Sequence, residues 1–278
     1  MIQIGQYNKL QVAEMSQFGA FLDGGNLGNI LLPNRYVTPE LKPGQEIEVF
    51  IYLDSEDRLV AITDHPLVTV GQFAYLQVND VTNVGAFLDW GLPKDLLVPF
   101  REQKLKMAEG NNYLVYVYLD DETNRIVASA KIEKFLDNVS PQYQPGEKVD
   151  LIIAGVTDLG YKAIINQTHS GLIYKNQTDQ SPETGQQMPG YIIRIREDEK
   201  IDLSLTPVGT GAITDNVELL WKNMELSDGF LPLTDNSSPD EIKGLLQMSK
   251  KAFKKAVGSL YKQGKILIEQ DGIRVKRP

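Results

Sequence analysis

The strongest constraint on the fold is an internal repeat, because self-similarity at a fixed period identifies a chain built from similar units. Gly19-Ala20-Phe21-Leu22-Asp23 returns as Gly85-Ala86-Phe87-Leu88-Asp89, and residues 30–33 return as 96–99, both at an offset of 66 residues. A weaker third copy follows the second at an offset of 75, with Gly160 in the place of Gly85. The chain up to Leu205 therefore consists of three related units.

Each unit has the sequence pattern of a small β-barrel. Residues 48–53 alternate between two faces as a strand does, and the acidic segments 54–57 and 120–124 are typical of turns that join the last two strands. The glycine before the aromatic residue in the repeated Gly-Ala-Phe indicates a bend or bulge within a strand. Five short strands in about 65–75 residues predict a closed barrel of the OB type, since an open sheet would leave unpaired edges.

The repeated elements resemble a known nucleic-acid-binding domain. They are a glycine-led strand, the Gly-Ala-Phe-Leu segment, a strand that ends in proline, a polar turn and a closing strand such as Lys200-Ile201-Asp202-Leu203-Ser204-Leu205. This pattern is similar to the S-one RNA-binding domain, which has an OB-fold. The resemblance implies three tandem S-one-like barrels.

The segment after Leu205 follows a different pattern. Ser238-Pro239-Asp240-Glu241 is typical of a helix start, with an N-cap serine, a proline in the first turn and two carboxylates near the positive end of the helix dipole. The segment predicts a helix over 215–224, a short strand within 230–233, helices from 239 and over 250–263, and a hairpin of 266–268 with 273–275. This order resembles a winged helix, so we expect a mainly β chain of three five-stranded OB-fold barrels followed by a small α+β winged-helix domain.

The helix over 250–263 divides into an apolar face and a basic face at 100° per residue. Its basic face and the hairpin supply the candidate nucleic-acid contacts Lys250, Lys251, Lys254, Lys255, Lys262 and Arg274. Lys250 and Lys251 lie in the first turn, where the helix dipole disfavours a cation by about 0.3–1 kcal/mol, and a bound phosphate would offset this cost. The alternative is a solvated face that keeps a short helix soluble.

The charge of the chain is unevenly distributed. The net charge is −9, yet residues 239–278 carry ten basic and four acidic side chains, which leaves −15 on the residues before them. An overall negative charge argues against a nucleic acid partner, whereas a basic C-terminal segment favours one. The local excess is the more informative of the two.

Together these features predict four domains: residues 1–66, 67–138 and 139–208 as S-one-like barrels, and 209–278 as the winged helix. The combination resembles the conserved virulence factor B family of Gram-positive bacteria over the whole chain. That resemblance implies a cytoplasmic RNA-binding protein that influences gene expression, including virulence factors in pathogens. The third barrel departs from the pattern, since Tyr161 follows Gly160 and Lys162 occupies the phenylalanine position.

An OB barrel binds single strands by stacking bases on exposed aromatic side chains beside cations that follow the backbone. In the family, aromatic residues that flank the glycine commonly face RNA. The candidate RNA-binding residues are Phe18, Phe21, Arg35 and Arg58 in the first barrel, Phe87, Phe100, Arg101 and Arg125 in the second, and Tyr161, Lys162, His169, Tyr174 and Lys175 in the third. The alternative for the aromatic residues, above all Phe21 and Phe87, is to fill the barrel core.

Several function classes are disfavoured. Cysteine is absent and the only histidines are His65 and His169, so the sequence contains no thiol nucleophile and no histidine cluster for a metal. The acidic run at 120–122 coincides with a turn and is better explained by solvation than by magnesium. We therefore expect no enzyme activity and no cofactor. No apolar run is long enough for a membrane helix and the N-terminus lacks a signal-peptide pattern, so we expect a cytoplasmic protein without a membrane partner.

The prediction for function is an RNA-binding regulator that holds single-stranded RNA across several barrels and the basic helix, since linked weak modules gain avidity. One alternative is a transcriptional regulator whose winged helix binds duplex DNA. Another is a docking scaffold that binds only proteins, whose identity the residues leave open.

Overall fold

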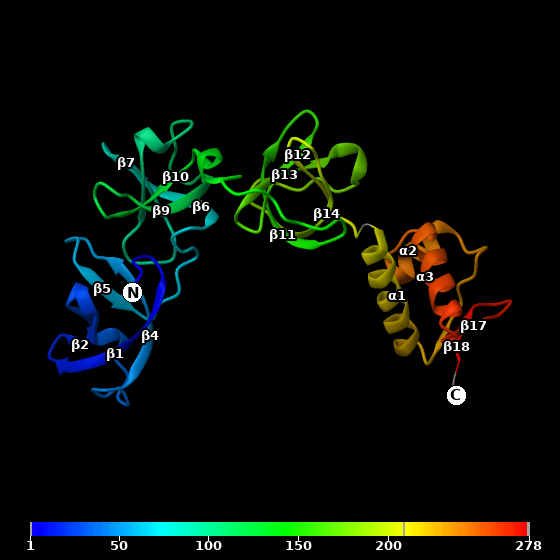
Figure 1. The fold of residues 1–278 in the computed structure, drawn as a ribbon, viewed down its shortest axis with the longest axis horizontal. Coiled ribbons are helices and arrows are strands. Elements are labelled where there is room, and N and C mark those ends of the chain that lie inside the picture. The colour runs from blue at the N-terminus through cyan, green and yellow to red at the C-terminus, as the bar shows by residue number, and fades with distance from the viewer. Residues whose placement is uncertain (1, 208, 277–278) are drawn as a thin grey trace. The chain divides into compact units, whose positions relative to one another are not determined.

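The computed structural model describes residues 2–207 and 209–276, with the side chains of 209–215 left out. It contains three closed five-stranded barrels and a helical domain with a three-stranded sheet (Figure 1). The predicted fold class is confirmed. The chain forms two compact units, Met1–Asn138 with the first two barrels and Val139–Pro278 with the third barrel and the helical domain.

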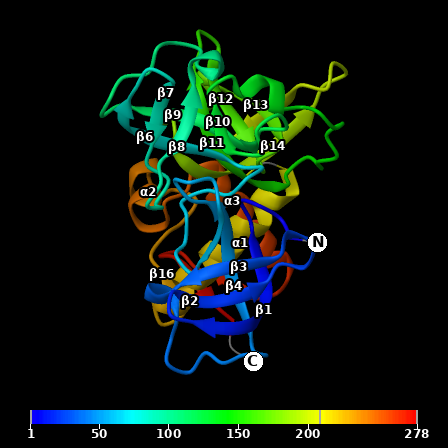
Figure 2. The same cartoon turned by 90° about the vertical axis from the view of Figure 1, so that its left-hand side faces the viewer.

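The first barrel is closed because β1 pairs with both β2 and β4, which gives the strand order β1-β2-β3-β5-β4. Strands β1 to β4 lie together in the lower half of Figure 2. Only β3 and β5 run parallel. The strands are β1 (Tyr7–Ser16), β2 (Gly19–Asp23), β3 (Asn29–Pro33), β4 (Glu46–Leu53) and β5 (Leu59–Ile62).

The second and third barrels repeat this topology strand for strand, including the parallel pair. The second comprises β6 (Phe73–Val81), β7 (Gly85–Leu88), β8 (Leu96–Pro99), β9 (Asn112–Leu119) and β10 (Ile126–Ser129). The third comprises β11 (Lys148–Val156), β12 (Gly160–Ile165), β13 (His169–Tyr174), β14 (Gln187–Ile195) and β15 (Ile201–Ser204). The acidic segments 54–57 and 120–124 are turns between the last two strands, as predicted.

The repeated glycine has a different role from the predicted one. The bulge lies in the preceding strand, where the register shifts between Val12 and Glu14 and at the matching sites of the other two barrels. The glycine begins the second strand, and a Cβ on Gly19, Gly85 or Gly160 would lie 2.0–2.3 Å from a carbonyl oxygen of the third strand. The residue is therefore needed for close strand contact, while the bulge bends the sheet.

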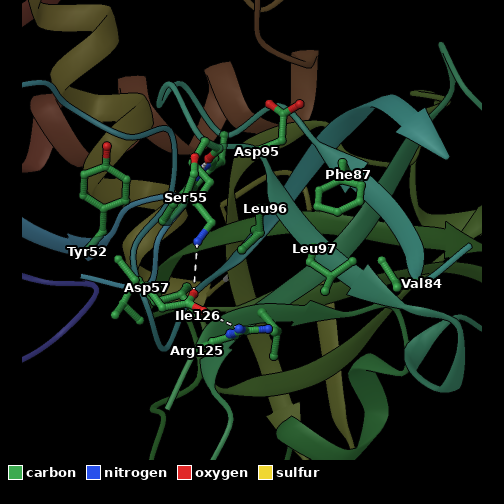
Figure 3. Close-up of a pocket in the computed structure, with 14 residues that line it drawn as sticks. Tyr52, Ser55, Asp57, Val84, Phe87, Asp95, Leu96, Leu97, Arg125 and Ile126 are labelled. Atoms are coloured by element: carbon green, nitrogen blue, oxygen red, sulfur yellow. Dashed lines mark hydrogen bonds and ion pairs between the residues drawn. The ribbon is translucent and has the colours of Figure 1, made fainter. Parts of the chain in front are cut away.

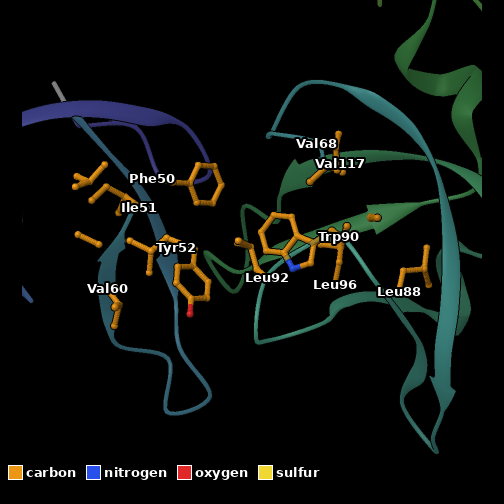
Figure 4. Close-up of a cluster of buried hydrophobic side chains, with 14 of the residues drawn as sticks. Phe50, Ile51, Tyr52, Val60, Val68, Leu88, Trp90, Leu92, Leu96 and Val117 are labelled. Carbon is orange, nitrogen blue, oxygen red and sulfur yellow. The ribbon is translucent and has the colours of Figure 1, made fainter. Parts of the chain in front are cut away.

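The first two barrels share one hydrophobic core. Phe50 on β4 and Trp90 in the loop after β7 meet edge to face, with ring centroids 6.0 Å apart, and Figure 4 shows them pointing toward each other from the two barrels. A backbone hydrogen bond from Val70 to Gly5 also crosses the junction, and Leu67, just after the first barrel, donates one to Trp90. Buried aromatic contact and paired backbone groups fix the two barrels to each other.

The helical domain has the predicted winged-helix order. Ser238 forms a capping box with Glu241, and Ser249 caps the next helix. Its elements are α1 (Gly209–Leu226), β16 (Phe230–Leu231), α2 (Pro239–Leu246), α3 (Lys250–Lys262), β17 (Ile266–Ile268) and β18 (Ile273–Val275). Helix α1 begins before and ends after the predicted 215–224, and its buried Leu220 and Met224 lie within the predicted range; the side chain of Asp215, the predicted helix start, lies outside the described residues. Among the described residues, no helix has both the length and the apolar character that a membrane crossing requires.

The close strand contact at the repeated glycine can be tested in the second barrel. In Gly85→Ala the new Cβ would lie 2.3 Å from the carbonyl oxygen of Val98, at a φ of +156°. Gly71→Ala is the control, since φ is +89° there but no atom lies within 4 Å. We expect Gly71→Ala to cost about 1–2 kcal/mol of unfolding free energy from backbone strain alone, and Gly85→Ala to cost about 1–3 kcal/mol more. Denaturant titration followed by Trp90 fluorescence in a Trp221→Phe background measures both, and equal costs would contradict the contact.

Candidate nucleic-acid interface

One exposed apolar side chain occupies the turn between the first two strands of every barrel. Phe18 is 62% exposed, Val84 is 51% exposed and Leu159 is 66% exposed. Sequence analysis predicted Phe18 as a stacking residue, and the 66-residue offset places Val84 at the same position of the second barrel, whereas Leu159 was missed because the third copy aligns weakly. Three equivalent apolar tips, of which only Phe18 is aromatic, give the first barrel the best surface for base stacking.

The other aromatic candidates of the first two barrels are partly accessible. Phe21 and Phe87 are half-buried at equivalent positions of β2 and β7, where each pairs across the sheet with a leucine of the third strand. Each ring is partly exposed to solvent, and neither belongs to the hydrophobic core cluster of the first two barrels. Phe100 follows β8 and is 44% exposed.

The barrel arginines are exposed but mostly paired with carboxylates of the acidic turns. Arg58 forms ion pairs with Asp54 and Glu56, and Arg101 forms ion pairs with Asp120 and Glu122. Hydrogen bonds from Arg58 lower the pKa of Asp54, although burial acts in the opposite direction. The turns thus hold the arginines that sequence analysis proposed for RNA. No group of three or more histidine or acidic side chains in residues 2–207 and 209–276 is arranged to hold a metal.

Arg35 and Arg125 are held differently. The Arg35 guanidinium lies 4.6 Å from the centre of the Tyr36 ring, and the Tyr36 hydroxyl donates a hydrogen bond of 2.5 Å to Asp64. Burial, followed by this hydrogen bond, raises the pKa of Tyr36 to about 12. Arg125 of the second barrel pairs with Asp57 of the first barrel.

Two candidates in the third barrel need correction. Tyr161 is 8% exposed and belongs to the barrel core, and His169 is 5% exposed. The Tyr143 hydroxyl and the Val139 carbonyl oxygen lie 2.8 Å from the two ring nitrogens of His169. Neither side chain can stack on a base without opening the barrel. Lys162 and Lys175 are exposed, and Tyr174 is half-buried beside Arg196.

Sequence analysis missed a charged cluster on the closing strands of the third barrel. Asp202 is 3% exposed and accepts hydrogen bonds from Arg194 at 2.7 Å and from Arg196 at 2.6 and 3.0 Å. Burial would raise the pKa of Asp202, but the hydrogen bonds from Arg196 and Arg194 lower it below its usual value. A sequence signal for this cluster does exist. Arg194 and Arg196 are two residues apart and therefore lie on the same face of their strand, next to Asp202 of the paired strand.

The lysine face, defined as Lys250, Lys251, Lys254, Lys255 and Lys262, lies on α3 opposite the buried Phe253, Ala256, Val257 and Leu260. Four of these lysines are exposed and Lys250 is half-buried. Among the described residues, only Lys254 of this face forms an ion pair, with Asp235 at 3.3 Å. Arg274 pairs with Glu269 and lies 4.5 Å from the centre of the Phe230 ring. The lysine face is the largest group of available cations that sequence analysis predicted.

Comparisons with known proteins agree with this architecture. An S1 domain family matches residues 4–64 and 70–131, and a CvfB-like winged helix domain family matches residues 218–275. The protein YitL of Bacillus subtilis is 30% identical over 277 residues, which cover 95% of this chain and 91% of the relative. The chain belongs to the conserved virulence factor B family. Both domain types are nucleic-acid-binding domains, and their combination fits a nucleic-acid-binding protein.

Other relatives carry the family name. Conserved virulence factor B of Staphylococcus aureus strain RF122 is 26% identical over 283 residues, which cover 99% of this chain and 94% of the relative. A solved multidomain protein with nucleic acid binding domains from Streptococcus pneumoniae aligns over 98% of both chains, with 24% identity and a TM-score of 0.41.

The Asp202 cluster predicts a pH-dependent contribution to the third barrel. Since the folded-state pKa of Asp202 lies below the usual 3.8, its stabilisation is complete above that value and is lost as pH falls through the folded pKa. Asp202→Asn should therefore destabilise the barrel by about 1–3 kcal/mol at neutral pH and have little effect in strong acid. Amide hydrogen exchange on β14 and β15 measures the difference, and an equal cost at both pH values would contradict the charged role.

Proposed function

We propose that this protein binds single-stranded RNA through its barrels and the lysine face, and thereby affects gene expression. The observation that carries the proposal is the exposed ring of Phe18 at the tip of an S1-type barrel, with half-buried Phe21 on the adjoining strand. A phenyl ring in this setting can stack on an unpaired base and contributes about 1–3 kcal/mol for each base. The Staphylococcus relatives are named conserved virulence factor B, which links the family to virulence.

The lysine face supports phosphate binding of either RNA or DNA. Lysines on a helix neutralise phosphates without regard to sequence, and a winged helix with a basic helix is also suited to duplex DNA. The barrels favour a single strand over duplex DNA, because aromatic side chains on a barrel cannot reach bases stacked within a duplex.

The deciding experiment compares single-stranded RNA, single-stranded DNA and duplex DNA in one fluorescence anisotropy assay at a fixed salt concentration near physiological. We expect the tightest binding for single-stranded RNA. Equal or tighter binding of duplex DNA would instead support a transcriptional regulator, and an absence of nucleic acid binding would support a docking scaffold.

Changing Lys250, Lys251, Lys254 and Lys255 to Ala together tests the contribution of the lysine face. The variant should fold, because these side chains point away from the domain core. Each phosphate that is no longer neutralised should flatten the plot of log affinity against log salt by about 0.7 for a single strand. Affinity should fall to a similar extent for all sequences, since phosphates carry no base information.

Phe18→Ala is the matched contrast to the lysine variant. It should weaken binding while leaving the salt slope nearly unchanged, because stacking releases few counterions. An unchanged slope in the folded lysine variant would mean that the lysine face is only solvated and that the RNA site lies wholly on the barrels.

A further inference from the structure

A crevice lies at the junction of the first two barrels, within one compact unit. Its volume is about 250 Å³, and residues of both barrels line it. Figure 3 shows Asp57 and Ser55 from the first barrel facing Arg125, Ile126, Leu97 and Phe87 from the second. This volume lies below the ~300–1,000 Å³ of typical small-molecule sites, so the crevice suits a single planar group better than a whole free ligand.

A carboxylate of the first barrel neutralises the cations of this crevice. Asp57, in the turn between β4 and β5, forms ion pairs with Arg125 and with Lys94, whose Nζ lies 3.5 Å from the carboxylate. The Lys94 ammonium also donates a hydrogen bond of 2.6 Å to the Asp54 carbonyl oxygen. Asp57 is an exposed residue, and the hydrogen bond from Arg125 lowers the pKa of its carboxyl.

This pairing across barrels distinguishes the second barrel from the first. Arg58 precedes β5 as Arg125 precedes β10, but Arg58 pairs with Asp54 and Glu56 of its own turn. A carboxylate and a phosphate oxygen bind guanidinium and ammonium groups in the same way. Asp57 therefore occupies a place that an RNA phosphate beside the second barrel would fill.

The wall next to these cations is apolar and partly open. Phe87, Leu97 and Ile126 line it and are half-buried, and the buried Trp90 lines it as well. Asp95 also lines the crevice and can accept a hydrogen bond from an amino group of a base, as acidic side chains do for cytosine. The crevice thus offers a surface for a base beside two cations for its phosphate.

We propose that this crevice binds one nucleotide of a single strand, with its base against Phe87 and its phosphate on Arg125 and Lys94 in place of Asp57. This inference rests on the proposed function and adds a site that depends on both barrels. Asp57 acts as an internal competitor, so weak or isolated phosphates are excluded and a strand enters only when its base also fills the crevice.

Asp57→Asn tests the competitor, with Glu56→Gln as the matched control. Both variants remove one negative charge from the same turn, but among the described residues Glu56 forms an ion pair only with Arg58 of its own turn. Asn suits the φ of 59° at this position, and the shared core keeps the barrels docked. Asp57→Asn should tighten single-stranded RNA binding about two- to fivefold more than Glu56→Gln, the size of an exposed ion pair. Its salt slope should steepen by about 0.7 for each additional phosphate that the freed cations neutralise.

A local signal shows whether RNA enters the crevice. The chain has two tryptophans, so Trp221→Phe leaves Trp90, which lines the crevice, as the single reporter. We expect a short single-stranded RNA of mixed sequence to change Trp90 emission at the concentrations at which anisotropy reports binding. RNA binding without a change in Trp90 emission, or equal effects of the two charge variants, would overturn the crevice site and leave the proposed function intact. No RNA binding in any variant would overturn the proposed function itself.

Discussion

Closure of a five-stranded barrel is the constraint on which the other features depend. Each barrel closes because its first strand pairs on both sides, with a bulge that bends the strand and a glycine that lets the next strands approach. Once closed, the interior is filled by alternate side chains of every strand. Residues that bind a partner must therefore come from the turns and from the outer face, which is where Phe18, Val84 and Leu159 lie.

The distribution of charge follows from the same turns. The acidic turn between the last two strands pairs with Arg58 in the first barrel and with Arg101 in the second, and Asp57 reaches Arg125 across the junction. Exposed ion pairs of this kind add little stability, but they keep the cations of the barrels from acting as a general phosphate-binding surface. Cations without such partners are concentrated on α3, where the described lysine face has one ion pair.

The sequence predicted the fold closely because its signals are local and repeated. The repeat predicted the barrel topology. Serine caps, together with apolar residues three and four positions apart, predicted α2 and α3. The site was harder to predict in the third barrel. Ala20 and Ala86 are fully buried, so alternation places Tyr161 at the inward position and Lys162 at the outward one. Sequence analysis proposed Tyr161 as a stacking residue because an aromatic residue beside the glycine suggested base stacking, although Tyr161 takes the place of the buried Ala20. The burial of His169 depends on Tyr143 and Val139, which lie far from it in the sequence, and no local pattern reveals such contacts.

Rigid docking of the first two barrels affects the combined affinity of weak binding sites that lie on both of them. Flexibly linked modules gain avidity through an effective concentration set by the linker, whereas the shared core of Phe50 and Trp90 holds two surfaces in one orientation. A nucleic acid strand that contacts both barrels loses its translational and rotational freedom once, so its second contact costs less entropy than the first. In the proposed function, the negative charge of the barrels opposes phosphates of any nucleic acid, and the stacking of unpaired bases offsets that cost. Under the same proposal, selection for single strands arises from the balance between this repulsion and base stacking.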